Sequence, residues 1–287
     1  MSVTKVSSAM QDLTDDYAFS GTVSGAGNPG RGTIGGLTLT NDGTDAAHDI
    51  GIAVGFARDY TDAATMSLTG ALIKKIDATW AVGTNAGGMD STDTVGANTG
   101  YGVYLIRRSD TGVVDVLMSS DMTAAGSALT MPTNYDQKRL IGWVRTDGSS
   151  NIFAFIQSGD TFKLQGAHTA IDLADTSITN STFETATLTT PPLCNALIQV
   201  YCVNTSRTNN VQYSYLKTKG SAWAVGGDKA SHSIQGGSGT TFDSFCYERE
   251  LFANSSSQIE YAMDEPSGSS TMKIIIQGCN LLTRSNP

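Results

Sequence analysis

The sequence predicts an all-β protein, with an antiparallel β-sandwich or jelly-roll-like body and a short N-terminal arm that is helical or extended. Three observations carry this prediction: Thr, Ser and Gly are abundant (31 Gly), short apolar segments alternate with turn residues, and no long amphipathic pattern follows residue 20. Thr favours the pleated surface of a sheet, and Gly favours tight corners. We therefore expect roughly twelve to fifteen short strands.

Residues 1–33 form the predicted attachment and oligomerisation arm. The spacing of its apolar residues alternates between three and four, as at the a and d positions of a coiled coil. These residues are Val3, Val6, Met10, Leu13 and Tyr17. Two heptads are fewer than a coiled coil normally needs, so a loose arm is an equal alternative. The Gly-rich stretch 25–30 is typical of a linker.

Residues 34–165 form the first predicted β-rich domain. Its strand candidates are 34–40, 50–57, 101–107, 113–119, 139–145 and 151–157. Segment 101–107 is apolar on both faces, which predicts burial on both sides. Asp110-Thr111-Gly112 is a predicted hairpin turn, and 147–150 is a predicted hairpin connection.

Residues 166–287 form a second β-rich domain or continue the same sandwich. The polar stretch 166–182 is a plausible boundary between the two. Segments 211–215, 258–263 and 272–277 alternate between apolar and polar residues. Such alternation predicts antiparallel strands with one buried and one wet face.

Charge and targeting features narrow the compartment and the partners. The formal net charge is −9 and the isoelectric point is about 4.7, which disfavours nucleic acid as a partner. The N-terminus lacks the apolar core of a signal peptide, and no stretch approaches the roughly 18 apolar residues of a membrane span. We expect synthesis in a reducing cytoplasm, no membrane insertion, and four free, mostly buried cysteines.

Catalytic chemistry finds little support in the sequence. There is no G-x-S-x-G motif, and only His48, His168 and His232 could act as imidazole bases. The Asp-rich stretches 42–49 and 90–93 are expected to cap turns, and we predict no metal and no cofactor. Paired carboxylates could mark a glycan-cleaving enzyme. The candidates are Asp110, Asp115, Asp172, Asp175, Glu184, Glu248, Glu250 and Glu260.

Aromatic side chains are the better candidates for binding, because an aromatic face suits the apolar C–H patch of a sugar. Trp80 and Trp223 adjoin Gly-rich, polar stretches, and Tyr135 lies in a polar segment. These three are the candidate ligand contacts, although buried packing is the commoner role for each of them. Trp143 alternates with Ile141 in a strand and is predicted to be core.

Four segments follow one another in a fixed order: LTLTNDGTDAAHDIGIAVG (37–55), LIKKIDATWAVGTNAGGMD (72–90), YGVYLIRRSDTGVVDVLMS (101–119) and MPTNYDQKRLIGWV (131–144). Together they resemble a domain of structural proteins of tailed bacteriophages, usually tail-fibre-like or host-recognition proteins. The string LIRRSDTGVVDVL is the most specific of them. The opening residues resemble attachment regions of short phage fibres, and the ending resembles the terminal strand of the same proteins.

This resemblance implies a virion component made in the host bacterial cytoplasm, and it brings no catalytic residues with it. The expected role is a non-enzymatic, homotrimeric short tail fibre or receptor-binding protein that contacts host-surface glycans. Its arm would bind other virion proteins. The alternatives are a capsid decoration, head-fibre or baseplate protein that binds other virion subunits, and a glycan depolymerase.

Overall fold

The computed structural model confirms the all-β, sandwich-like prediction. It describes residues 32–166, 169–178, 182–204, 211–222, 224–225, 232–235, 243–263 and 270–282, and its regular elements there are strands without an α-helix. The five apolar residues predicted to form the seam of the arm lie outside these ranges. The described residues include no helix that could span a membrane.

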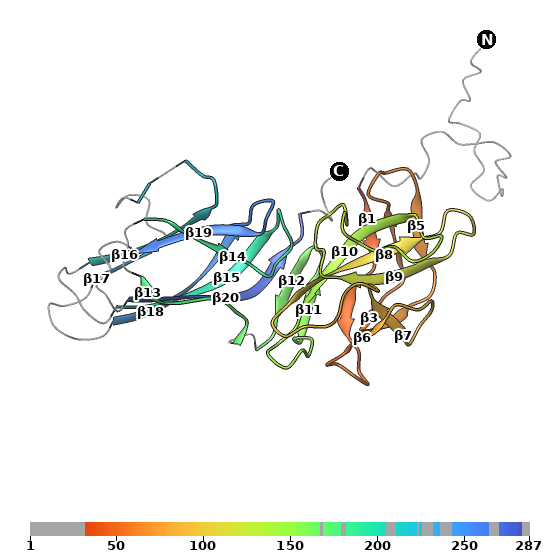
Figure 1. The fold of residues 1–287 in the computed structure, drawn as a ribbon, viewed down its shortest axis with the longest axis horizontal. Helices are drawn as coiled ribbons and strands as arrows, with labels where there is room; N and C mark the ends of the chain where they lie inside the picture. Colours follow the sequence, from red (N-terminus) through yellow and green to blue (C-terminus); the bar gives the residue numbers. More distant parts are fainter. Residues whose placement is uncertain are drawn as a thin grey trace, which may run out of the picture.

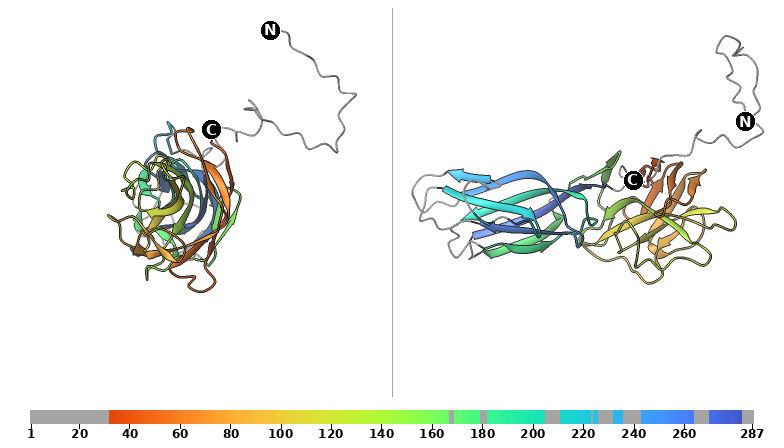
Figure 2. Two further views of the ribbon diagram at one scale, coloured as in Figure 1. Left: turned by 90° about the vertical axis from the view of Figure 1, so that its right-hand side faces the viewer. Right: turned by 90° about the horizontal axis from the view of Figure 1, so that it is seen from above.

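The chain folds into two lobes that lie end to end (Figures 1 and 2). In the first lobe, β1, β4 and β5 form a three-stranded sheet, and a seven-stranded sheet has the order β10-β8-β9-β7-β6-β3-β2. Only the β6–β7 and β7–β9 pairs are parallel there. The strands are β1 (Ile34–Gly36), β2 (Leu39–Asn41), β3 (Asp49–Ile52), β4 (Gly55–Arg58), β5 (Thr65–Leu68), β6 (Leu72–Thr79), β7 (Ala86–Met89), β8 (Gly100–Arg107), β9 (Val114–Ser119) and β10 (Gln137–Arg145).

The second lobe pairs a six-stranded sheet with a four-stranded one. The larger has the order β11-β12-β20-β15-β18, with β13 also on β20, and the smaller has the order β14-β19-β16-β17. Its strands are β11 (Phe155–Ser158), β12 (Thr161–Leu164), β13 (Ile171–Ile178), β14 (Glu184–Thr187), β15 (Asn195–Asn204), β16 (Val211–Thr218), β17 (His232–Gln235), β18 (Asp243–Phe252), β19 (Gln258–Met263) and β20 (Ser270–Asn280).

Strand β20 ties the two halves of the chain into one sheet. Its first part, up to Ile275, pairs with β13, and its last residues from Gly278 pair with β12. Because β15 pairs with β20 from Thr271 to Asn280, β12 and β13 share the opposite side of β20, one after the other. The two halves of the chain therefore meet along strand β20.

Two of the predicted strands are each divided between two sheets. The candidate 34–40 is interrupted at Gly36 and Leu37, whose φ angles are 67° and 54°. Left-handed residues cannot continue an extended strand, so the chain passes from the three-stranded to the seven-stranded sheet. The candidate 50–57 is also divided, into β3 of the seven-stranded sheet and β4 of the three-stranded sheet. The Leu37 N–H donates to the carbonyl oxygen of Val54 (3.3 Å), so the two places where the chain changes sheets are in contact.

The central hairpin of the first lobe follows the prediction. Strand β8 is buried on both faces, and the turn to β9 is closed by two hydrogen bonds between Arg108 and the residues Gly112 and Val113 (both 2.9 Å). Gly112 has a φ of 75°, which a Gly adopts without steric cost. The candidate 151–157 was too long at its start, since a single bridge from Thr146 to Ile152 closes the turn and β11 begins only at Phe155.

The second lobe keeps the predicted alternation in β19 and β20, whose apolar residues are buried. Strand β16 differs, because Ser214, predicted to lie on a wet face, is fully buried. Its hydroxyl hydrogen-bonds the Tyr247 hydroxyl of β18 (2.9 Å). The face of β16 that carries Ser214 is thus covered by the neighbouring sheet.

A buried polar contact closes the junction of the lobes. The Arg145 guanidinium of β10 lies 2.7 Å from the Asp172 carboxylate of β13, and both side chains are excluded from solvent. The same carboxylate accepts a hydrogen bond from the Thr189 N–H (2.6 Å). The indole N–H of Trp143 donates to the Thr189 carbonyl oxygen (3.0 Å), and Trp143 is core, as predicted.

Candidate functional site

Trp80 borders a cleft of about 370 Å³ on the first lobe. The residue directly follows β6, and its side chain is half-buried. The cleft lies between this strand end, the start of the loop after β7, strand β9 and the loop before β10. Its lining residues are Thr79, Trp80, Ser91, Leu117, Thr130, Met131, Pro132 and Thr133.

The Trp80 ring is held by contacts on several sides. Its indole N–H donates to the Val116 carbonyl oxygen of β9 (3.1 Å). Tyr135 meets it edge-on, with ring centroids 5.2 Å apart and an interplanar angle of 76°. The Lys74 ammonium lies 5.4 Å from the ring centroid, within the range of a cation–π contact. Since the N–H is used internally, the ring presents only aromatic carbon to the cleft.

A buried ion pair next to the Trp80 ring supports this arrangement. The Lys74 Nζ is 2.8 Å from the Asp115 carboxylate, and neither side chain is exposed. Lys74 also donates to the Ala81 carbonyl oxygen (2.7 Å), and the Gly83 N–H donates to Asp115 (2.8 Å). Burial lowers the pKa of Lys74, while the adjacent Asp115 carboxylate opposes that shift. The pair therefore fixes the turn that directly follows Trp80.

Two of the three predicted ligand-contacting residues, Trp80 and Tyr135, contact each other, but only Trp80 lines the cleft. Trp80 reaches the cleft, while Tyr135 is only 7% exposed and acts as a support behind the ring. Trp223 lies outside the described residues. Ligand contact by these residues stays a prediction, and Trp80 is the one whose position suits it.

Lys74 and Asp115 were missed as parts of this site, although the sequence carries a signal for Lys74. Strand β6 alternates, and Lys74 falls on the same face as the fully buried Ile76. A Lys at an inward position needs a partner charge. The strand pattern identifies the need, but only the sheet order brings β9 close enough to supply Asp115.

The Asp side chains in the Asp-rich turns of the first lobe stabilise the backbone of those turns. The Asp42 carboxylate accepts hydrogen bonds from the backbone N–H groups of Thr44 (2.7 Å) and Asp45 (3.2 Å), which lower its pKa. Asp90 accepts hydrogen bonds from Thr92 and Thr130 in the same way. Among the described residues, no three His, Cys, Asp or Glu side chains gather closely enough to hold a metal ion.

Half of the candidate carboxylates are committed to ion pairs. These pairs are Arg108–Asp110, Lys74–Asp115, Arg145–Asp172 and Lys217–Glu260. Two others converge on one phenol: the Tyr261 hydroxyl lies 3.1 Å from both Asp175 and Glu184. Burial and these two carboxylates raise the pKa of Tyr261. A single phenol proton can serve only one carboxylate at a time.

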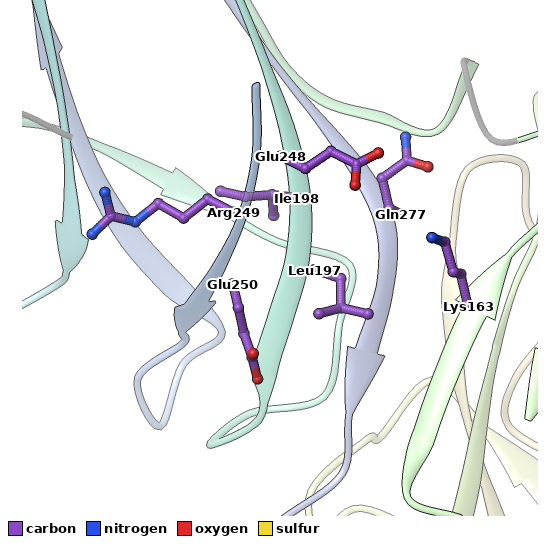
Figure 3. A pocket seen from close by; sticks show the side chains of 7 residues that line it. All are labelled: Lys163, Leu197, Ile198, Glu248, Arg249, Glu250 and Gln277. Atoms are coloured by element: carbon purple, nitrogen blue, oxygen red, sulfur yellow. The ribbon is translucent and has the colours of Figure 1, made fainter. Parts of the chain in front are cut away.

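A second, smaller cleft of about 240 Å³ crosses the outer face of the six-stranded sheet (Figure 3). It contains the last two candidate carboxylates, Glu248 and Glu250 of β18, with Lys163 of β12 at its other end. In Figure 3, the Glu248 side chain extends toward Gln277, whereas that of Glu250 extends away from it. The two carboxylates thus do not converge on a common point.

Comparison with known proteins adds no family: no family model matches the chain, and no curated protein is significantly similar to it.

Proposed function

We propose that this protein is a non-enzymatic structural component of a tailed-bacteriophage particle, a short tail fibre or receptor-binding protein that contacts host-surface glycans. Two independent lines support the proposal. One is the resemblance of segments 37–55, 72–90, 101–119 and 131–144 to phage fibre-like proteins. The other is the geometry around Trp80, which carries the glycan-contacting part.

The observation on which the proposal rests is a half-exposed aromatic ring in a cleft rimmed by hydroxyl groups. A sugar presents apolar C–H patches and hydroxyls together, so it needs both kinds of surface at once. Trp80 supplies the apolar surface, and the Thr and Ser side chains around it supply donors and acceptors. Because the ring is already held in place, little conformational entropy is lost on binding.

The arm and the oligomeric state complete the proposal. Residues 1–33 attach the protein to other virion proteins and associate three chains through the seam that contains Val3 and Leu13. A single shallow cleft binds a sugar weakly, and three copies on one particle multiply the affinity. Association of identical chains thus compensates for the small size of each site.

The experiment is adsorption of the purified full-length protein to host cells, with Trp80→Ala as the test variant. Tyr60→Ala is the matched control, because Tyr60 is an aromatic residue that is 48% exposed and does not line the cleft. We expect Trp80→Ala to reduce adsorption at least about ten-fold and Tyr60→Ala to leave it unchanged. Equal adsorption by all three proteins would contradict the glycan-contacting role.

Two further measurements test the other parts of the proposal. Imaging of the virion with this chain located distinguishes a tail fibre from a capsid decoration, head-fibre or baseplate protein, and a stable monomer in solution contradicts the trimer. Release of reducing ends from host polysaccharide would contradict the non-enzymatic role. In that case Asp175→Asn is the variant to examine first, because Asp175 and Glu184 are the candidate acids that converge.

A further inference from the structure

The charge of the cleft beside Trp80 restricts the ligand further than the proposed function does. None of its eight lining residues carries an ionisable side chain. Two charged groups next to the lining are satisfied internally: Lys74 pairs with Asp115, and the fully buried Asp90 accepts hydrogen bonds from Thr92 and Thr130. A ligand carboxylate held against this lining would therefore lose hydrating water without gaining a cation.

Apart from the indole N–H, which is used internally, the polar side-chain groups of the lining residues are hydroxyls. Thr79, Ser91, Thr130 and Thr133 each bring one group that can donate and accept. This set matches ligand hydroxyls, which likewise donate and accept, and it has no preference for either sign of charge. The net charge of −9 adds a long-range repulsion against anionic ligands at low ionic strength.

The apolar groups lie in the same small space. Trp80, Leu117, Met131 and Pro132 form the rest of the lining. A volume of about 370 Å³ is near the lower end of the range of roughly 300–1,000 Å³ for small-molecule pockets. A protein partner normally covers a much larger area than such a cleft offers. The space thus suits one or two sugar rings.

The walls of the cleft are already connected to each other. The Asp90 carboxylate joins the loop after β7, through Thr92, to the loop before β10, through Thr130. The hydroxyls of these two Thr residues also hydrogen-bond each other (3.1 Å). Binding therefore needs no large ordering of these loops, which favours a ligand as small as a single ring.

We infer that the cleft beside Trp80 is selective for an uncharged pyranose, which it recognises by aromatic contact with C–H groups and by the surrounding hydroxyls, and which it prefers over the corresponding uronate. This inference rests on the proposed function only in taking the ligand to be a sugar. It adds the charge class of the ligand and the reason that the indole N–H takes no part in recognition.

The test compares methyl β-D-glucopyranoside and methyl β-D-galactopyranoside with methyl β-D-glucuronide, by saturation-transfer NMR and titration at neutral pH. We expect at least one neutral glycoside to bind at least about ten-fold more tightly than the glucuronide. Trp80→Ala should abolish the signal, whereas Trp80→Phe should retain part of it because aromatic carbon remains. Equal or tighter binding of the glucuronide would overturn the inference, as would binding that Trp80→Ala leaves unchanged.

A gain-of-function variant keeps the test independent of folding defects at Trp80. Thr133 is exposed at the rim, so Thr133→Arg adds a cation without disturbing the core. We expect this variant to raise glucuronide affinity at least about five-fold relative to the neutral glycosides, and Thr133→Gln to leave the ratio unchanged. A ratio unmoved by the Arg substitution would contradict the placement of the ligand.

Failure of this inference and failure of the proposed function are distinguishable. Host adsorption that depends on Trp80, together with preferred glucuronide binding, overturns the inference and keeps the proposed function. Selective binding of neutral glycosides by a protein absent from phage particles keeps the inference and overturns the proposed function.

Discussion

Replacement of Asp172 by Ala should destabilise the whole protein, because it leaves a cation buried between the lobes. Arg145 and Asp172 are 2.7 Å apart, and their side chains are 0% and 1% exposed. Asp172 also accepts hydrogen bonds from the N–H (2.6 Å) and the hydroxyl (3.0 Å) of Thr189. Removing one partner of a buried ion pair costs about 3–5 kcal/mol.

The expected change is large enough for a thermal melt. For a domain of roughly 150–250 residues, 1 kcal/mol corresponds to about 2–4 °C, so Asp172→Ala should lower Tm by about 6–20 °C. Circular dichroism and scanning calorimetry should agree on this shift. Asp77→Ala, which removes an exposed Asp, should change stability by no more than about 0.5 kcal/mol.

The double variant Arg145→Met/Asp172→Leu tests whether the loss of stability in Asp172→Ala comes from an uncompensated charge. It removes both charges and keeps apolar volume, so it should be more stable than Asp172→Ala. A Tm for Asp172→Ala within about 2 °C of the wild type would refute the reasoning. So would a double variant no more stable than the single one, because the loss could then not come from an uncompensated charge.

Three further predictions test the lobes, the loops and the cysteines. A Cβ at Gly100 would lie 2.3 Å from a carbonyl oxygen of the second lobe, whereas one at Gly70 would meet no heavy atom within 4 Å. In urea titrations, Gly100→Ala should therefore lower the free energy of unfolding by about 1–3 kcal/mol, and Gly70→Ala by less than about 1 kcal/mol. Burial raises the pKa of Asp93, but hydrogen bonds from Ser119 and Ser120 outweigh that effect, so that the pKa is lowered overall. Its stabilisation is therefore present above about pH 4 and lost as the pH falls through the folded pKa, so the urea midpoints of wild type and Asp93→Asn should converge as the pH falls below about 4. In the native protein a thiol reagent should label Cys246 rapidly and the three buried cysteines only after unfolding; equal labelling rates for all four would contradict the fold.

Local patterns predicted the strands that lie within a single sheet. Strand β8 reads as apolar on both faces, and it is buried on both. The alternation in β20 correctly assigned its buried face, because side chains in a strand point to opposite sides in turn. The prediction was wrong where the chain changes sheets, at Leu37 and at Val54. A change of sheet depends on which distant strands are available, and no local pattern records that.

The candidate site, too, was predictable only in part. The polar, Gly-rich sequence beside Trp80 identified it as a candidate, and Tyr135 was a candidate as an aromatic residue in a polar segment. Their contact was not predictable, since more than fifty positions of chain separate them. The fixation of the ring depends on Lys74 and Asp115, which lie on strands that the sheet order brings close together.

The sequence by itself determined the fold class, the main strands of each half and the residue types available for binding, because these follow from the periodicity and chemistry of neighbouring residues. Only the tertiary structure decided which charges neutralise one another, where the lobes meet and which aromatic ring borders a cleft. These features depend on contacts between residues far apart in the chain, such as Arg145 with Asp172 and Trp80 with Val116. Their energies arise when both partners leave water together, and the packing of the sheets sets which partners do so.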